Sequence, residues 1–216
     1  MKKVIISVLL LACMTCVFAK SHLNFTAPCK ISILHNDETY NSVQGSEICQ
    51  KSRGNSELQA TTGLTAEYLY TFGERAFGIG AKIGCDAGNV GMTVDISETS
   101  FSTRGSTAGW NIAPALGFIL GDSTKKQITL YPIGYEFYSL TKLKDEDNYK
   151  FKDSTIETLT SGAAFSWQWG SKVYNGFEIG FNILLNPVLK VDGKNYFNTE
   201  GMGIDFHAAY KLTLDL

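Results

Sequence analysis

The chain has 216 residues, 44% of them hydrophobic, with 19 basic and 21 acidic side chains and a formal charge of −2. This length is ample for one domain, and no basic cluster points to nucleic acid as a partner. Beyond Ala19 no stretch approaches the roughly 18 continuous apolar residues of a spanning helix, so the sequence predicts no transmembrane helix.

Residues 1–19 have the pattern of an export signal. Two lysines precede an apolar stretch that ends at Ala12, and Val17-Phe18-Ala19 supplies small residues for cleavage after Ala19. Cleavage would leave residues 20–216 as a single domain with a formal charge of −4, because the signal holds two basic and no acidic residues. Two alternatives stay open: an uncleaved membrane anchor, and lipidation of Cys13, whose surroundings resemble the bacterial lipobox.

Apolar side chains recur at every second position in eight segments of the chain. Successive residues of a β-strand point to opposite faces, so this alternation predicts eight strands, each with one apolar face. In chain order, the apolar faces run from Leu23 to Ile33, Leu64 to Phe72, Phe77 to Cys85, Trp110 to Leu120, Tyr131 to Phe137, Leu159 to Trp169, Phe177 to Leu185 and Ile204 to Leu216.

The spacers between these segments alternate in length. Longer spacers lie at about residues 36–57, 89–105, 144–154 and 188–200, and shorter ones at 73–75, 121–126 and 170–175. Long loops on one side and tight turns on the other predict an all-β fold, a closed antiparallel eight-stranded up-and-down transmembrane β-barrel with four longer outer loops and three short periplasmic turns. An even strand number brings both termini to the short-turn side, where the first and last strands can pair.

Two prolines interrupt the predicted ladder. Pro114 and Pro132 fall inside neighbouring strands, although proline has no amide hydrogen to donate to a ladder bond. Counted outward from the turn at residues 121–126, the two positions lie close together across the hairpin. We therefore expect a β-bulge or a broken pair of hydrogen bonds at this point.

Alternation alone does not show which face of the barrel is wet. A lipocalin-like soluble barrel would place the apolar face inside, but an eight-stranded barrel is only just wide enough for its interior side chains. The apolar face here carries roughly five large residues per strand, which is too much volume for that interior. The reverse arrangement places Gly, Ala, Ser, Thr and a few charges inside, and leaves Tyr and Trp for interfacial girdles. A membrane barrel is favoured, with a soluble exported ligand-binding barrel as the lesser alternative.

This pattern resembles the small outer-membrane barrels of Gram-negative bacteria, the family that includes OmpX, OmpW and the membrane domain of OmpA. The resemblance covers nearly all of residues 23–216. Such proteins end in an assembly signal of alternating apolar residues, which Tyr210, Leu212, Leu214 and Leu216 follow, although the family usually ends in Phe. The resemblance implies a monomer in the bacterial cell outer membrane. The implied partners are outer-membrane lipid, lipopolysaccharide-type lipid and, through the C-terminal strand, the barrel-assembly machinery.

The predicted inward face carries charges that a narrow lumen tolerates only when they are paired. We expect a polar network in the barrel interior formed by Lys30, Glu67, Lys82, Asp86, Glu136, Glu178, Asp205, His207 and Lys211. Acids and bases are both present, so mutual pairing that stiffens the barrel is the favoured interpretation. A polar path for small solutes or ions is the alternative.

No residue is predicted to be catalytic. Some enzymes on this architecture use a His with a Ser and an acid, but His207 and Asp205 share one strand without a serine motif. His35 with Ser42 and Glu38 is a trio that a serine-rich chain offers by chance. His22 is expected in a periplasmic tail.

No metal or cofactor site is predicted either. The run Asp145-Glu146-Asp147-Asn148 lacks the spacing of a calcium loop, and the sequence has no nucleotide-binding fingerprint. Cleavage after Ala19 would leave three cysteines, Cys29, Cys49 and Cys85. An odd number of cysteines argues against a disulfide framework, while a single Cys49–Cys85 bond stays an open alternative.

The function that these features predict is that of a non-enzymatic integral outer-membrane protein. Its strands would form a rigid scaffold, and its loops would bind an extracellular ligand or serve adhesion or envelope integrity. The segment from Asp37 to Glu57 is the longest polar loop and the best candidate contact surface. The alternative is a narrow channel for small or hydrophobic solutes, of the OmpW kind.

Overall fold

The computed structural model describes residues 20–36, 39–41, 50–52, 55–72, 77–96, 99–121, 124–144, 152–191, 194–195 and 202–216. Within these ranges no helix is long and apolar enough to cross a membrane. Several features discussed above lie outside the described residues: the export signal at residues 1–19, Glu38, Ser42, Cys49 and the acidic run at residues 145–148.

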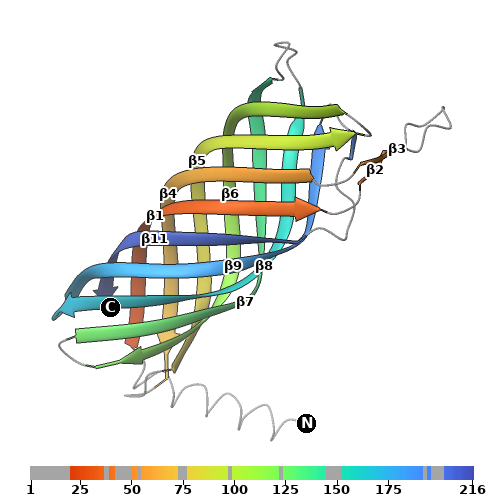
Figure 1. The fold of residues 1–216 in the computed structure, drawn as a ribbon. Coiled ribbons are helices and arrows are strands. Elements are labelled where there is room, and N and C mark those ends of the chain that lie inside the picture. The colour runs from red at the N-terminus through yellow and green to blue at the C-terminus, as the bar shows by residue number, and fades with distance from the viewer. Residues whose placement is uncertain are drawn as a thin grey trace, which may run out of the picture.

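Eight long strands form one closed antiparallel sheet (Figure 1). They are β1 (Lys20–Asn36), β4 (Asn55–Thr71), β5 (Phe77–Ile96), β6 (Thr99–Leu120), β7 (Thr124–Lys144), β8 (Ser154–Gly170), β9 (Val173–Val191) and β11 (Met202–Asp215). The short strands are β2 (Thr39–Asn41), β3 (Gln50–Ser52) and β10 (Lys194–Asn195). Each long strand pairs with its neighbours in chain order and β11 pairs with β1, so the predicted eight-stranded up-and-down barrel is confirmed.

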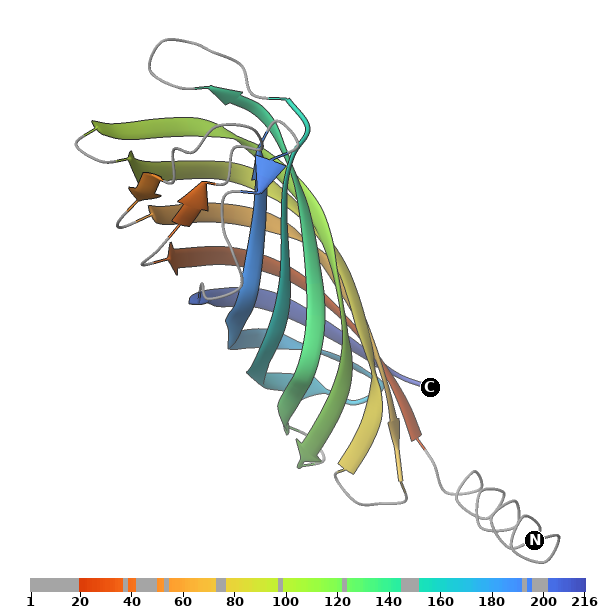
Figure 2. The same cartoon turned by 90° about the vertical axis from the view of Figure 1, so that its right-hand side faces the viewer.

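The seam between the first and last strands closes the barrel. The β1–β11 ladder runs from His22 opposite Asp215 to His35 opposite Met202. At its end the amide of Leu216 donates to the carbonyl of Ser21 at 2.9 Å. Figure 2 shows the chain end beyond β11 at one end of the barrel and the β2–β3 hairpin near the other. The strands β2 and β3, which belong to the predicted contact segment, and the C-terminus therefore lie at opposite ends.

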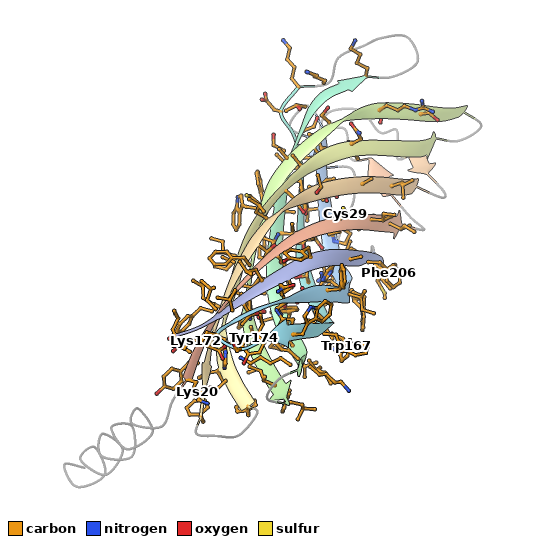
Figure 3. All side chains as sticks on the ribbon, turned by 90° about the vertical axis from the view of Figure 1, so that its left-hand side faces the viewer. Lys20, Cys29, Trp167, Lys172, Tyr174 and Phe206 are labelled. Atoms are coloured by element: carbon orange, nitrogen blue, oxygen red, sulfur yellow. The ribbon has the colours of Figure 1, made fainter. Side chains whose placement is uncertain are left out.

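The apolar face of the sheet points outward, as expected for a membrane barrel. Thirty large apolar side chains among the described residues are exposed, including all three tryptophans. Trp167 and Phe206 project from the outer surface (Figure 3), and their exposed fractions are 53% and 55%. An apolar surface of this extent needs hydrocarbon around it. The arrangement is the reverse of a lipocalin-like barrel.

Aromatic rings gather toward both ends of this apolar band. Near the short turns, Phe77 packs between Phe72 and Phe118 with ring centroids 6.2 and 5.3 Å apart. Toward the far end, Trp110 packs against Tyr135 and Phe137 at 5.5 and 6.1 Å. Two aromatic girdles of this kind mark the membrane–water interfaces of barrel proteins.

The expected irregularity at the prolines is a β-bulge in β7. The four-residue step from Ile112 to Leu116 on β6 opposes the five-residue step from Leu130 to Tyr135 on β7. A matching register shift separates β7 from β8 at the same place. The bulge contains Pro132, so the missing amide falls where the ladder is already interrupted.

The bulge also corrects one assignment. Pro132 and Ile133 are consecutive and both exposed, so the alternation of faces changes phase between them. Tyr131, predicted on the outward face with Ile133, Tyr135 and Phe137, instead points inward and is only 2% exposed. The prolines predicted that a bulge occurs here, but they did not predict which side chains would change from the outward to the inward face.

A second correction concerns the predicted loop at residues 89–105. The backbone there is strand: β5 continues to Ile96, β6 begins at Thr99, and these two residues pair. The exposed residues of this region include Asn89, Ser102 and Arg104, so the apolar period disappears although the ladder continues. Likewise, β9 extends to Val191, into the spacer predicted at residues 188–200. The β5–β6 hairpin thus continues past the apolar band.

A charge on the outward face should be costly. Ile179 is 61% exposed near the middle of the apolar run of β9, so Ile179→Arg should lower the free energy of unfolding by about 2–4 kcal/mol. The measurement is urea unfolding in lipid vesicles followed by tryptophan fluorescence, with Ile179→Leu as the control. Equal stability of the two variants would place this face in water.

Candidate functional site

The interior of the barrel holds the polar side chains that the sequence predicts there. All nine predicted network residues occupy inward positions. Seven are at most 8% exposed, namely Lys30, Glu67, Asp86, Glu136, Glu178, Asp205 and Lys211, while Lys82 and His207 are half-buried. They come from β1, β4, β5, β7, β9 and β11. The contacts divide them into an inner cluster nearer the short turns and an outer cluster nearer the β2–β3 end.

The inner cluster is built around Glu67. Its Oε1 accepts hydrogen bonds from Asn24 Nδ2 at 2.7 Å and Gln127 Nε2 at 3.1 Å, and its Oε2 accepts one from the Tyr131 hydroxyl at 2.7 Å. The Lys211 ammonium lies 4.0 Å from Oε1. Buried carboxylates need such donors because burial removes their water. Asn24 is the ladder neighbour of Glu67 on β1, whereas Gln127 and Tyr131 reach it across the lumen from β7.

Lys211 completes the inner cluster. Its Nζ donates to Glu178 Oε2 at 2.8 Å, and His207 Nε2 lies 3.5 Å from Glu178 Oε1. Gly180 is required beside them, because a Cβ at that position would overlap the His207 ring. Lys82 joins through a cation–π contact, with its Nζ 3.7 Å from the centroid of the Tyr131 ring.

The outer cluster is built around Lys30. Its Nζ lies 3.0 Å from Glu136 Oε2 and 3.3 Å from Asp86 Oδ2, and it also donates to the Tyr138 hydroxyl. That hydroxyl donates in turn to Asp86 Oδ2 at 2.9 Å. The Lys30 ammonium therefore contacts two carboxylates, those of Glu136 and Asp86, and the Tyr138 hydroxyl links it to Asp86 a second time.

Asp205 has an amide partner and, among the described residues, no ion pair with an ammonium group. Asn182 Nδ2 donates to its two carboxylate oxygens at 2.9 and 3.1 Å. His207, two residues farther along β11, places its Nε2 3.5 Å from Glu178 Oε1 instead. The Asp205–His207 pair is thus divided between two partners and does not form the dyad of a hydrolase.

A small cavity of about 30 Å³ lies between the two clusters. Its lining includes Lys30, Lys82, Asp86, Asn111 and His207. Buried Asp86 Oδ1 and Asn111 Oδ1 have no hydrogen-bond partner among the described residues, so both can accept from water. A volume of this size accommodates about two water molecules. It is too small for an organic solute.

Apolar layers lie on both sides of the polar clusters. At the inner end, buried Leu69 packs with Ala113, Ala115, Tyr131 and Ala164. At the outer end, five inward side chains from five strands are 2–4% exposed: Leu34, Val90, Leu140, Ile156 and Leu184. Buried apolar side chains thus flank the two charged clusters, and further polar side chains lie beside and beyond them.

A third group, which we call the terminal cluster, was missed by the sequence interpretation. His22 was expected in a periplasmic tail but lies in β1, is 4% exposed, and places Nδ1 2.7 Å from Asp215 Oδ1. Lys125 Nζ donates to Asp215 Oδ2 at 2.6 Å and lies 3.8 Å from the Tyr174 ring centroid. Asn24 and Thr26 continue the same inward alternation, which was the signal that could have placed His22.

A chain of neutral side chains was also missed. Gln168 Nε2 donates to Thr213 Oγ1 at 2.7 Å, and that hydroxyl donates to Asn24 Oδ1. Asn24 then donates to Glu67, so the chain joins β8, β11, β1 and β4. Sequence reasoning selected charges as functional and gave these amides and hydroxyls no weight, although they satisfy the charges.

Metal and cysteine sites find no support in the described part of the chain. No group of three or more His, Cys, Asp or Glu residues there could hold a metal ion. Cys29 and Cys85 are free and exposed on the outer surface, while Cys49 lies outside the described residues.

Comparisons with known proteins give a fold and no close relative. No family model matches the chain, and no curated protein matches it. The outer membrane protein OprG from Pseudomonas aeruginosa superposes with a TM-score of 0.56 at 9% identity, covering 91% of this chain and 97% of that one. The outer membrane protease OmpT from Escherichia coli reaches a TM-score of only 0.37 at 9% identity, over 92% and 96% of the chains. The likeness to OprG shows that this chain has the fold of small outer-membrane barrels.

Breaking the inner cluster should be expensive. Lys211→Met leaves Glu178 buried without its ammonium, which should cost about 3–5 kcal/mol of unfolding free energy. The matched control is Lys190→Met, which removes a 3.1 Å ion pair with Glu157 whose side chains are 40% and 31% exposed. That change should cost less than about 1 kcal/mol.

Urea titration of both variants in the same detergent measures this difference. Adding Glu178→Gln to Lys211→Met should recover part of the loss, because the remaining group carries no charge. Similar small costs for both lysine variants would show that the interior is solvated.

Proposed function

We propose that this closed eight-stranded barrel, which has the fold of small outer-membrane proteins, is a non-enzymatic integral protein of the bacterial outer membrane. The barrel is a rigid scaffold in the bilayer, and recognition takes place on what it carries at its outer end. The outward apolar band and its two aromatic girdles support residence in a membrane. The export-signal pattern of residues 1–19 supports delivery to that membrane.

The observation that carries this proposal is the filled interior. Tyr138, Lys211, Leu69 and Gln168 are among the large side chains that are less than 2% exposed, and all point into the lumen. An eight-stranded barrel is just wide enough for such side chains and little else. A solute path would require the ion pairs of both clusters to separate in a medium that does not solvate them. These facts favour a scaffold over a channel.

The outer end of the barrel supports a role in recognition. There the outward residues of β6 include exposed Ser102 and Arg104, in place of the apolar residues that face lipid lower on the same strand. The β2–β3 hairpin, within the contact segment predicted from Asp37 to Glu57, lies at this same end (Figure 2). A polar surface on a rigid scaffold suits binding of an extracellular ligand, adhesion or support of the envelope.

The narrow channel of the OmpW kind is the second candidate, and it makes a different electrical prediction. We expect the protein to give no stepwise conductance in a planar lipid bilayer, because the cavity between the two clusters has a volume of about 30 Å³. Glu136→Ala and Lys82→Ala should leave the recordings silent. Glu157→Ala, on the outer surface, is the control. Steps that change with the two interior variants but not with the control would establish a channel.

Chemical labelling of intact cells tests the proposed location and orientation. In a background with Cys29, Cys49 and Cys85 replaced by Ser, Ser102→Cys should react with a membrane-impermeant maleimide added to cells. Lys172→Cys, exposed at the short-turn end, should react only after lysis. Labelling of the Lys172 position alone would invert the orientation. If both positions react only after lysis, the protein is not at the cell surface.

A further inference from the structure

The outer ends of β6 and β7 present three cations on the outside of the barrel. Arg104 and Lys144 are direct partners in the β6–β7 ladder, and both are exposed. Lys142 is exposed two residues before Lys144. We call Arg104, Lys142 and Lys144 the outer basic patch.

A β-bulge creates this patch. Between the pairs Arg104–Lys144 and Ser106–Thr141, β7 uses three residues where β6 uses two. If the same residues continued as a regular strand without a bulge, Lys142 and Lys144 would follow the inward alternation of Tyr138 and Leu140. The bulge turns Lys144 to the outer surface, where it meets Arg104. Lys142, within the bulge, has a φ of +56°, a conformation that costs energy for a residue with a side chain.

Among the described side chains, the charges of the patch have no anionic partner. Like charges that face each other across two strands repel. None of the ion pairs between described side chains involves Arg104, Lys142 or Lys144. On β9, by contrast, Lys190 is paired with Glu157 at 3.1 Å. An external anion would remove the repulsion.

The height of the patch indicates which anion is available. Arg104 lies six residues beyond Trp110 along β6. At about 3.3 Å per residue and a tilt of about 45°, this places it about 14 Å farther out than the aromatic girdle. The polar layer of a phospholipid bilayer is only about 5–7 Å thick on each side. Phosphates carried on the sugars of a larger glycolipid reach this height.

We propose that the outer basic patch binds the sugar-linked phosphate groups of an anionic glycolipid in the outer leaflet. The planar guanidinium of Arg104 suits bidentate contact with phosphate oxygens, and the lysines add point charges. The inference rests on the proposed residence in the outer membrane, and it assigns the glycolipid contact to one side of the barrel.

The test measures glycolipid binding in neutral detergent. The full gene product is extracted from membranes and mixed with a rough-type lipopolysaccharide, or with the same material after dephosphorylation. Bound lipid is counted by native mass spectrometry over a range of lipid concentrations. Arg104→Gln combined with Lys144→Gln should weaken binding about tenfold and flatten its salt dependence, since two phosphate contacts are lost. Dephosphorylated lipid should bind the unmodified protein equally weakly.

The matched control removes two cations from the other end of the same barrel. Lys126→Gln combined with Lys172→Gln changes the net charge equally at exposed sites near the short turns, and it should leave binding unchanged. Equal weakening by both double variants would reveal general charge attraction and overturn the assignment. Unchanged binding of the patch variant would overturn it too. A heat-dependent shift in gel mobility verifies that each variant is folded.

The acidic run that follows Lys144 needs its own variant. Asp145→Asn, Glu146→Gln and Asp147→Asn together should not weaken binding if the patch holds the phosphates directly. Weaker binding would show that these carboxylates hold the lipid through a divalent cation, which would overturn the assignment to the patch. Binding in detergent is independent of cellular location, so failure of the proposed location would appear in the maleimide labelling and not here.

Discussion

The structure depends on a constraint that hydrocarbon imposes on the backbone. An amide or carbonyl that faces lipid has no water to bond to, so it must find its partner in the protein. Along most of the sheet, strands that follow one another in the chain provide these partners for each other. At the seam, the first and last long strands, β1 and β11, pair instead. Closure at that seam then sets the circumference of the barrel, and the circumference sets what can lie inside it.

The narrow interior explains how its polar groups are satisfied. Side chains from opposite walls meet near the axis, so a charge on one wall can be satisfied from across the lumen, as Glu67 on β4 is by Tyr131 on β7. The large polar side chains require glycine nearby, and Gly180 beside His207 is one case. Charge, hydrogen bonding and packing therefore depend on one another here, and rigidity follows from their combination.

The strands and the orientation of their faces could be predicted because lipid exposure imposes a strict two-residue apolar period. The predictions were wrong where the apolar period was absent or changed phase, because the cause lay outside the sequence of the single strand. Ser102 and Arg104 lie on regular strand that has left the apolar band, so they were taken as loop. Tyr131 was placed on the wrong face because a bulge changes phase at Pro132. His22 was missed because its partners Asp215 and Lys125 are distant in sequence and meet it only after closure.

The bulge at Pro132 divides β7 into two parts in which the alternation of inward and outward side chains has opposite phase. Between the short turn and the bulge, the inward side chains have odd numbers, as Gln127 and Tyr131 do. Beyond the bulge, the inward side chains have even numbers, as Glu136 and Tyr138 do. If the same residues continued as a regular strand without the bulge, the composition of β7 would be unchanged. The environments of all residues beyond Pro132 would nevertheless be exchanged, bringing Phe137 into the lumen and Glu136 against hydrocarbon. The bulge therefore decides more about this strand than the identity of any single side chain does.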